Sequence, residues 1–297
     1  MNAEERGGAL ESLTVLDLSE GIAGPYAAQL MARFGARVIK VERPVTGDAA
    51  RAWGPYVKTD SGAEESLTFL ALNAGKLSLT LDYETPQGAA VLRRLAEDVD
   101  GIIEDHPSRR RAELGLSAEE LIARIPRLVI VQVSGYGASG PYQDRPLSGL
   151  TLAAAVGALP GDSVGPAYDR GLEHILGMNV FAASLAALSR AAQTEHGQVV
   201  DVGGMHVLAA VGGAPRPGGE AAVVDLETMR AAGLLEEVEQ PGVGVLAFPV
   251  APFQLSKTPA APLSPAPRLG EHTDYVLKDL IEMDAAEVEA LRALGAV

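Results

Sequence analysis

The stretch RGLEHILGMNVFAASLAAL, residues 170–188, combines an apolar helical pattern with a single carboxylate that could do chemistry. This carboxylate, Glu173, lies at the expected start of the helix, and Gly177 follows one turn later. A carboxylate in such a place can act as a nucleophile that forms a covalent acyl intermediate. It can equally be an acidic residue that the helix dipole favours in a first turn. Both interpretations remain open on these residues alone.

Three groups of basic residues are candidates for binding an anionic ligand. Arg43 ends the stretch ARVIKVER, Lys76 lies in NAGKLS, and the run Arg109, Arg110 and Arg111 follows DGIIED. We expect each group to lie at or beyond the carboxyl end of a strand, where open parallel sheets bind their ligands. A run of three arginines is by itself typical of a solvated helix start. Together, the three groups favour a phosphate-rich ligand.

Three other kinds of motif give little support to their usual chemistry. GYGASG, residues 135–140, fits the dinucleotide pattern G-x-G-x-x-G, but PYQDRP follows where that fingerprint needs a helix, so a glycine turn after a strand is predicted. Ser134 and Ser139 do not fit the G-x-S-x-G elbow of hydrolases. The five histidines have no paired spacing, and cysteine is absent, so no metal site is expected.

Length and charge bound the class of protein. The 297 residues suffice for one large α/β domain or two modest ones. With 39 acidic and 24 basic residues, the net charge of −15 disfavours nucleic acid and anionic membranes as partners. Apolar stretches broken by glycine or charge and a polar start, MNAEERGG, lead us to expect a soluble cytoplasmic protein with no membrane span.

The elements that must position these residues alternate along the chain. Short β-branched runs predict strands, and the segments between them predict helices, which together favour a parallel sheet. Thr85, Ser117 and Asp284 are expected helix caps, and a long helix is expected over about 174–193. After residue 211 the chain is rich in Gly, Pro and Ala until two short helices near its end. The predicted strands are LTVLDLS, ARVIKVE, LSLTLD, DGIIED, RLVIVQVS and GQVVDVG, and the predicted helices include PYAAQLMARFG, PQGAAVLRRLAEDV and SAEELIARI.

Five stretches of the chain together form a recognisable pattern: LTVLDLSEGIAGPYAAQLMARFGARVIKVERPVTGDAAR, LNAGKLSLTLDYETPQGAAVLRRLAEDVDGIIEDHPSRRRAELGL, VSGYGASGPYQDRP, SLAALSRAAQTEHGQVVDV and the tail VAPFQLSKTPAAPLSPAPRLGEHTDYVLKDL. They resemble the family III CoA-transferases, which include the carnitine and bile-acid CoA-transferases and are related to the α-methylacyl-CoA racemases. They span most of the chain in the order that the family has. The tail motif, P-x-x-L-S-x-T-P followed by P-A-P-x-L-G-E-H-T, is the most specific of them.

The resemblance implies an α/β fold with a Rossmann-like parallel sheet as the large domain, and an interlocked homodimer. It implies CoA as the bound cofactor, entering as acyl-CoA, and a carboxylic acid as acceptor. The residues at positions that it places near CoA and the acyl group are Ala23, Arg43, Lys76, the Asp105–Arg111 region with Arg109, Arg110 and Arg111, and the loop Gly135, Tyr136 and Gly137.

The resemblance also implies covalent carboxylate catalysis, in which an aspartate of the pattern D-x-x-x-G attacks the thioester. Counting from Gly177 and the A-A-L at 186–188 places that aspartate at Glu173. Asp169 is a fallback nucleophile whose register fits the pattern less well. Because a glutamate is one methylene longer, its carboxylate is displaced, and a shift of about 1 Å can cost on the order of a hundredfold in rate.

Besides Glu173, the chain departs from the family pattern at three further places. Ile22 replaces a polar amide before A-G-P, and Ser148 and Gly149 stand where racemases carry a His-Asp pair. Only GGAPRPGGEAAVVDL stands where the family inserts a small domain with a lid over the thioester, so this domain is largely deleted.

We therefore expect a large domain over 1–210, a remnant of the small domain over 211–240 and a returning segment over 241–297. The leading hypothesis is a CoA-transferase whose activity is impaired. The alternatives are a non-catalytic paralogue that binds CoA or a protein, and a repurposed acyl-CoA hydrolase or isomerase.

Overall fold

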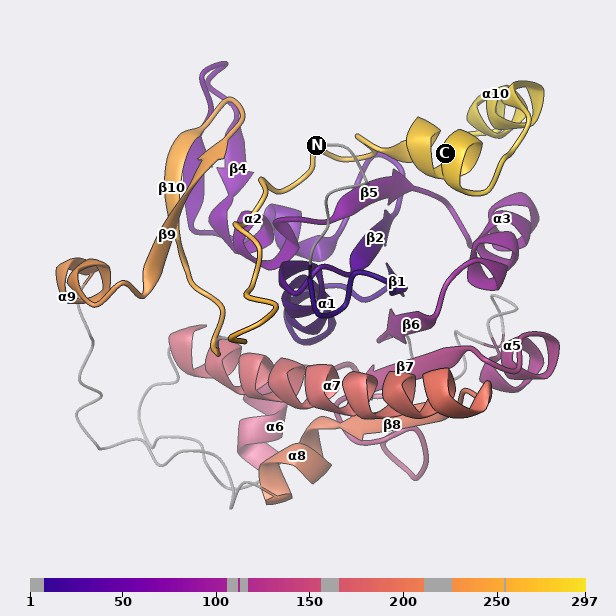
Figure 1. The fold of residues 1–297 in the computed structure, drawn as a ribbon, viewed down its shortest axis with the longest axis horizontal. Coiled ribbons are helices and arrows are strands. Elements are labelled where there is room, and N and C mark those ends of the chain that lie inside the picture. Colours follow the sequence, from indigo (N-terminus) through magenta and orange to yellow (C-terminus); the bar gives the residue numbers. More distant parts are fainter. Residues whose placement is uncertain (1–7, 106–111, 113–116, 156–165, 211–225, 254) are drawn as a thin grey trace.

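The fold is that of a computed structural model, which describes residues 8–105, 112, 117–155, 166–210, 226–253 and 255–297. Its centre is a six-stranded parallel sheet in the order β5-β2-β1-β6-β7-β8 (Figure 1). The six predicted strands and their parallel pairing are confirmed. The pattern predicted them correctly because β-branched runs of this length are typical of strands buried on both faces. The strands are β1 (Thr14–Asp17), β2 (Arg37–Glu42), β5 (Leu77–Thr80), β6 (Gly101–Glu104), β7 (Val129–Ser134) and β8 (Val199–Gly203).

The sheet has a switch point between β1 and β6. From β1 the chain builds outward through β2 to β5, and then returns to β6 and continues through β7 to β8 on the other side. Where the order reverses, the loops that leave neighbouring strands run in opposite directions and open a crevice at the carboxyl ends. The loop after β1 and the loop after β6 are therefore the expected walls of a ligand site.

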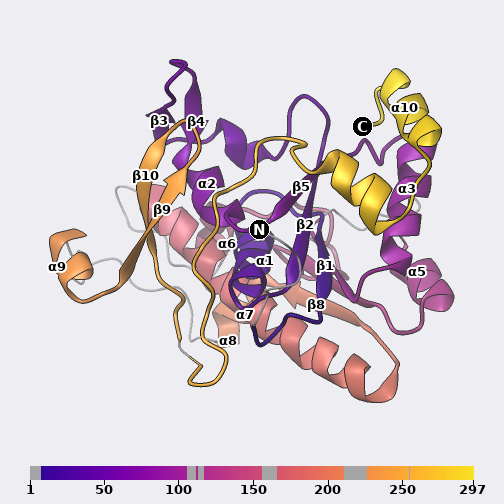
Figure 2. The same cartoon turned by 45° about the horizontal axis from the view of Figure 1, so that its top comes forward.

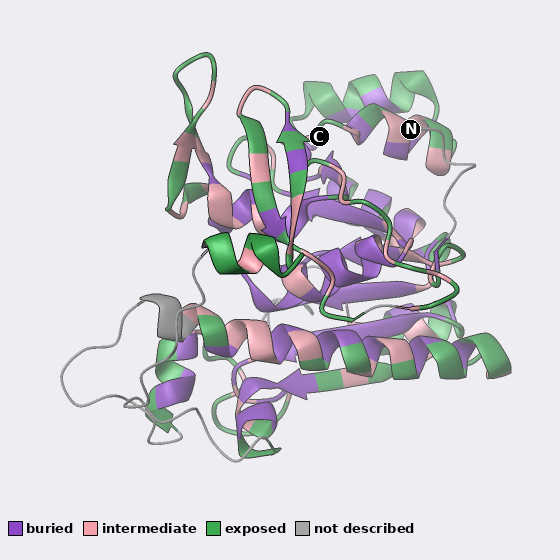
Figure 3. Ribbon diagram, turned by 60° about the vertical axis from the view of Figure 1, so that its left-hand side comes forward, coloured by how far each residue is buried: buried purple, intermediate pink, exposed green. Residues whose placement is uncertain are grey.

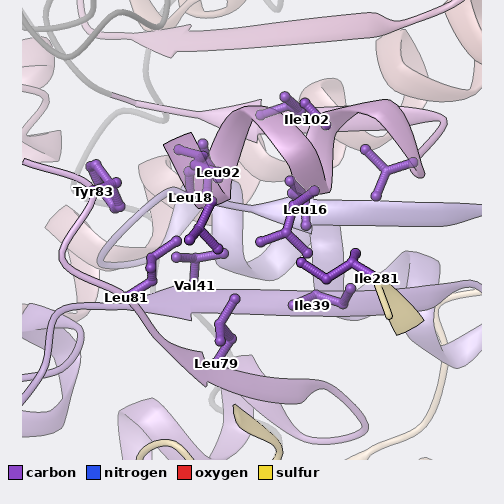
Figure 4. Packing of buried hydrophobic residues seen from close by; sticks show 14 of the residues in the cluster. Leu16, Leu18, Ile39, Val41, Leu79, Leu81, Tyr83, Leu92, Ile102 and Ile281 are labelled. Carbon is purple, nitrogen blue, oxygen red and sulfur yellow. The ribbon is translucent and has the colours of Figure 1, made fainter. Parts of the chain in front are cut away.

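One face of the sheet is covered by α3 (Pro86–Glu97), α5 (Ala118–Arg124), the π-helix η3 (Tyr275–Leu280) and α10 (Ala285–Ala293). Their side chains pack on Leu16, Ile39, Leu79 and other apolar residues of the strands (Figure 4). Thr85, Ser117 and Asp284 each accept a hydrogen bond from a first-turn amide, as predicted for caps. The C-terminal segment thus returns to the sheet.

The other face is covered by α1 (Ala23–Arg33) and α7 (Pro166–Thr194), with α6 (Gly149–Ala155) and α8 (Gly204–Ala210) beside them. In Figure 3 buried and exposed residues alternate along α7, as in a helix with one face on a core. No apolar stretch of membrane-spanning length was expected, but Arg170–Thr194 is long and apolar enough to cross a bilayer. Its buried residues, among them Leu176, Val180 and Leu188, pack in the same core as α1 and the strands.

Two antiparallel hairpins lie beside the sheet and were not predicted (Figure 2). Segments such as LEEVEQ are rich in charge and lack the regular apolar alternation that indicates a strand. With α2 the hairpins enclose a small third core that contains Phe69, Val238 and Phe248. The elements are η2 (Ala49–Ala52), β3 (Tyr56–Lys58), β4 (Glu64–Ser66), α2 (Leu67–Asn73), α9 (Leu226–Ala231), β9 (Leu235–Gln240) and β10 (Gly244–Pro249).

The hairpin β9-β10 crosses the expected domain boundary at residue 240, since its two strands pair directly. Residues 211–225, where the small domain is expected to be reduced, lie outside the described part of the chain. The division into domains stays a prediction.

Candidate active site

At the switch point of the sheet, the loop after β1 is joined to the residue that follows β6. The backbone N–H of Glu20, in the loop between β1 and α1, donates to Asp105 Oδ2 at 3.0 Å, and Asp105 directly follows β6. Burial, opposed in part by that hydrogen bond and by Lys40, raises the pKa of Asp105 to about 8. The predicted ligand residue Asp105 therefore lies at the switch point as a carboxyl group that holds its proton at neutral pH.

Glu173 lies two turns inside α7, because the helix begins at Pro166 rather than near residue 174. Proline is favoured in a first turn, where its missing N–H is not needed, so the helix extends upstream of the apolar pattern. The interpretation of Glu173 as a first-turn charge is therefore wrong. The carboxylate is half-buried, and its Oε1 accepts a hydrogen bond from the backbone N–H of Gly149 at 3.0 Å.

The close approach of α1 and α7 brings Glu173 near the start of α1. A Cβ at Gly177 would lie 2.6 Å from the carbonyl oxygen of Ala23, the first residue of α1, so only glycine permits this contact. Glu173 lies one turn before Gly177 on the same helix. Arg170, three residues before Glu173, donates to the carbonyl oxygen of Gly54 at 2.9 Å and so ties α7 to the segment after β2.

The glycine turn at 135–140 is confirmed, and it approaches the same part of α7. It follows β7 without a helix, Gly137 has φ +94°, and its N–H donates to Ser134 Oγ at 2.8 Å. Tyr136 packs against the small core that contains Leu172, the residue before Glu173. Gly135 and Tyr136 are thus close to the segment that carries the candidate nucleophile.

The basic candidates differ sharply in their surroundings. Arg43 follows β2, its side chain is 45% exposed, and its guanidinium lies 3.8 Å from Glu20 and 3.5 Å from Glu84. Such long, exposed ion pairs are weak, so the guanidinium can turn to a phosphate. Arg109, Arg110 and Arg111 lie outside the described residues, as does the side chain of Asp169.

Lys76 contradicts the expectation that it lies at the carboxyl end of a strand, since it precedes β5. Its side chain is fully buried, and Nζ donates to Asp17 Oδ2, the Pro25 carbonyl and Asn73 Oδ1 at 2.7 to 2.8 Å. Three donors are thus used inside the protein, and Lys76 has none to offer a ligand in this arrangement. Burial lowers the pKa of Lys76 to about 8, although Asp17 opposes the shift.

Lys76 belongs to a buried charged cluster that was not predicted from the sequence. Asp17 and Lys40 are fully buried although each carries a full charge. The signal was present, because both stand inside otherwise apolar strands, LTVLDLS and ARVIKVE. A charge within a buried strand needs partners, which makes such positions candidates for a polar network. The other members are Ser19, Glu42, Asp48, Arg51, Asn73 and Ser78.

In the part of the chain that the structure describes, no group of three His, Asp or Glu side chains is placed to hold a metal ion.

Comparison with known proteins places this site in a family context. Residues 10–215 match the sequence profile of CoA-transferase family III. The chain is 34% identical over 209 residues to a succinate–glutarate CoA-transferase of Agrobacterium fabrum, which covers 68% of this chain and 52% of that protein. It is 37% identical over 203 residues to a succinyl-CoA–D-citramalate CoA-transferase of Chloroflexus aurantiacus, covering 65% and 48%. The chain thus spans about half the length of these relatives.

Solved structures with the same fold include a CaiB/BaiF family protein from Brucella suis. It superimposes with a TM-score of 0.76 at 22% identity, over 92% of this chain and 100% of that one. The protein Rv3272 from Mycobacterium tuberculosis gives a TM-score of 0.76 at 22% identity, over 91% and 99%. At this identity the likeness concerns the fold, and the predicted Rossmann-like α/β sheet is confirmed.

Proposed function

The chain belongs to CoA-transferase family III, and we propose that it moves CoA from an acyl-CoA thioester to a carboxylic acid through the Glu173 carboxylate. The observation that carries this proposal is the placement of Glu173: a half-buried carboxylate oriented by the Gly149 N–H, one turn from the contact of α7 with the start of α1. A nucleophile held in one orientation is what covalent carboxylate catalysis needs.

The proposed reaction proceeds through three covalent enzyme species: a mixed anhydride with the donor acid, a glutamyl-CoA thioester, and a mixed anhydride with the acceptor acid. A Glu173 oxygen attacks the thioester carbonyl carbon, the C–S bond breaks, and a mixed anhydride and CoA thiolate result. The thiolate attacks the glutamyl carbonyl carbon and expels the donor acid, which leaves a glutamyl-CoA thioester. The acceptor carboxylate attacks this thioester, and the released thiolate then takes the acceptor acyl group and frees Glu173. Charges and atoms balance without an added proton.

We propose succinyl-CoA as the CoA donor and a second dicarboxylic acid as the acceptor. The relatives from Agrobacterium and Chloroflexus carry succinate or succinyl-CoA in their names, together with glutarate or citramalate as the other acid. Arg43 fits the CoA end of such a donor, because its guanidinium is exposed at the carboxyl end of β2. Lys76 would have to leave Asp17 to reach a phosphate, so we propose that it supports the site from within. We further propose that the protein acts as a homodimer in the cytoplasm.

A second candidate function is a non-catalytic CoA-binding paralogue. It is favoured by the glutamate at position 173, whose extra methylene shifts the carboxylate relative to the aspartate that the resemblance implies. One experiment separates the two functions. The protein is incubated with succinyl-CoA, trapped with hydroxylamine or borohydride, and mapped by mass spectrometry, with Glu173→Gln as the matched control.

A modification at residue 173 in the wild type that is absent from the Glu173→Gln variant supports covalent transfer. A modification at Asp169 instead would identify the fallback nucleophile. CoA binding in calorimetry without any adduct favours the paralogue, and failure of CoA to bind overturns both.

A further inference from the structure

A buried ion pair lies beneath the loop that joins β1 to α1. Lys40 comes from β2 and Asp48 from the segment before η2, and neither side chain has any solvent exposure. Lys40 Nζ lies 2.7 Å from Asp48 Oδ2, so the two groups form a close ion pair. Because neither group reaches solvent, neither can touch a substrate, and the pair has to act through what it holds.

What the pair holds is the backbone of the loop. Lys40 Nζ donates to the carbonyl oxygen of Ser19, and Asp48 Oδ1 accepts the N–H of Gly21 at 3.1 Å. Asp105 accepts the N–H of Glu20 between them. Three consecutive residues are thus fixed by side chains from three separate segments, at the switch point of the sheet.

Charge balance explains why the pair is stable in the interior. The cluster around it contains three carboxylates and three basic groups, so no charge is left without an opposite partner. Such a cluster contributes little net stability compared with apolar packing, but it specifies one arrangement of the polar groups that it binds. The members are Asp17, Glu42, Asp48, Lys40, Arg51 and Lys76.

The loop leads directly into the contact that locates the candidate nucleophile. Gly21 has φ +79° and lies beside the Trp53 ring, and Ala23, two residues later, touches Gly177 of α7. A displaced loop therefore moves the start of α1 against the helix turn that follows Glu173.

We infer that Lys40 and Asp48 are positioning residues that fix the Ser19–Gly21 loop and, through the start of α1, the place of bound acyl-CoA relative to Glu173. This inference rests on the proposed function. It requires two acceptor oxygens at residue 48, because both carboxylate oxygens of Asp48 have partners: Oδ2 contacts Lys40, and Oδ1 accepts from the N–H groups of Gly21 and Ala50.

Asp48→Asn tests whether two acceptor oxygens are needed at this position. An amide has one oxygen, so it cannot serve both Lys40 and the Gly21 N–H. We expect faster hydrogen exchange in the segment 19–22 and a loss of about tenfold or more in kcat for CoA transfer, with a smaller change in KM. The double variant Lys40→Met with Asp48→Asn removes both charges together, so two carboxylates and two basic groups remain in the cluster. It serves as the second variant if the unbalanced charge in Asp48→Asn unfolds the chain. Because it lacks the bond from Lys40 to the Ser19 carbonyl oxygen, it is also expected to show faster exchange at 19–22 and a lower kcat.

Glu42→Gln is the matched control. Glu42 is a buried carboxylate of the same cluster and contacts Arg51, Ser78 and the Asp48 N–H, but not the loop backbone. If Glu42→Gln lowers kcat as much as Asp48→Asn at equal loss of stability, the cluster is merely structural and the inference is wrong. Unchanged exchange at 19–22 in Asp48→Asn also overturns it. If the wild type transfers no CoA, the proposed function fails, while hydrogen exchange still decides whether the pair holds the loop.

Discussion

Gly177 of α7 and Ala23 of α1 are in backbone contact: a Cβ on Gly177 would lie 2.6 Å from the carbonyl oxygen of Ala23. A backbone atom cannot turn aside as a long side chain does, so any side chain at 177 must push the helices apart. Because Glu173 is one turn away, this contact sets how far the candidate nucleophile lies from the start of α1.

Gly177→Ala is therefore expected to destabilise the protein by about 1–3 kcal/mol through overpacking, despite the better helix propensity of alanine. Gly171→Ala is the control on the same helix, since its Cβ would meet no atom within 4 Å. It is expected to be neutral or to stabilise by up to about 1 kcal/mol. Urea unfolding followed by circular dichroism measures both. Equal effects of the two substitutions would show that the helices do not meet at 177.

The hydrogen bond from the Gly149 N–H to Glu173 can be removed without a substitution in α7, the helix that carries Glu173. Gly149 is the first residue of α6, where proline is tolerated, and Gly149→Pro deletes the donor N–H. We expect adduct formation at Glu173 to slow by about tenfold, the order of a hydrogen bond to a charged group. Gly149→Ala keeps the N–H and controls for the added side chain. Trapping after fixed times of incubation with succinyl-CoA gives the rates, and equal rates in the two variants would argue against this orienting role.

Arg43 and Lys76 are expected to separate ligand binding from stability. Arg43→Met removes an exposed guanidinium with weak ion pairs, so the free energy of unfolding is expected to change by less than about 1 kcal/mol. The Kd for CoA is expected to rise by about tenfold. Lys76→Met leaves a buried Asp17 short of a partner and is expected to cost about 3–5 kcal/mol. Calorimetry with CoA and denaturant unfolding test the pair. A stable Lys76→Met variant with impaired CoA binding would instead indicate that Lys76 contacts the ligand directly.

The raised pKa of Asp105 predicts a stability that falls with pH. The unfolded chain loses this proton near the ordinary pKa of 3.8, whereas the folded protein holds it to about 8. Between these values the folded state binds more protons, so the free energy of unfolding decreases as pH rises from about 4 to 8. Asp105→Asn keeps an acceptor for the Glu20 N–H and has no proton to lose.

The expected result is that Asp105→Asn melts a few degrees above the wild type at pH 8 and that the difference disappears toward pH 4. Thermal melts across this range, with Asp279→Asn at an exposed position as control, test the prediction. A difference that grows toward low pH would contradict it.

The main sheet was predictable because its strands carry their own signal. Runs such as RVIKVE and VIVQVS are buried on both faces and rich in β-branched residues. The caps Thr85, Ser117 and Asp284 indicate helix starts because they form local hydrogen bonds with first-turn amides. The hairpins were missed because segments such as LEEVEQ are held by pairing with a partner strand and by a shared core, neither of which is visible in the segment itself.

The candidate site divides in the same way. Residue types and a family resemblance located Glu173, Arg43 and the Gly135 turn as points along the chain. Neither the residue types nor the resemblance could show that Arg43 is exposed while Lys76 donates to Asp17 inside the protein. In the sequence, both are single basic residues beside predicted strands. Two of the three hydrogen-bond partners of Lys76, Asp17 and Pro25, are more than 50 positions away in the sequence.

By itself, the amino-acid sequence determined the strands of the main sheet, the helices with caps, the glycine turn and the chemical type of the groups at the site, since these depend on neighbours within a few residues. Only the tertiary structure decided that Glu173 lies inside its helix rather than at its start, and that Lys40 and Asp48 hold the loop before α1. The physical reason is that backbone groups and buried charges must all find partners, and those partners come from distant segments that only the packed sheet brings together.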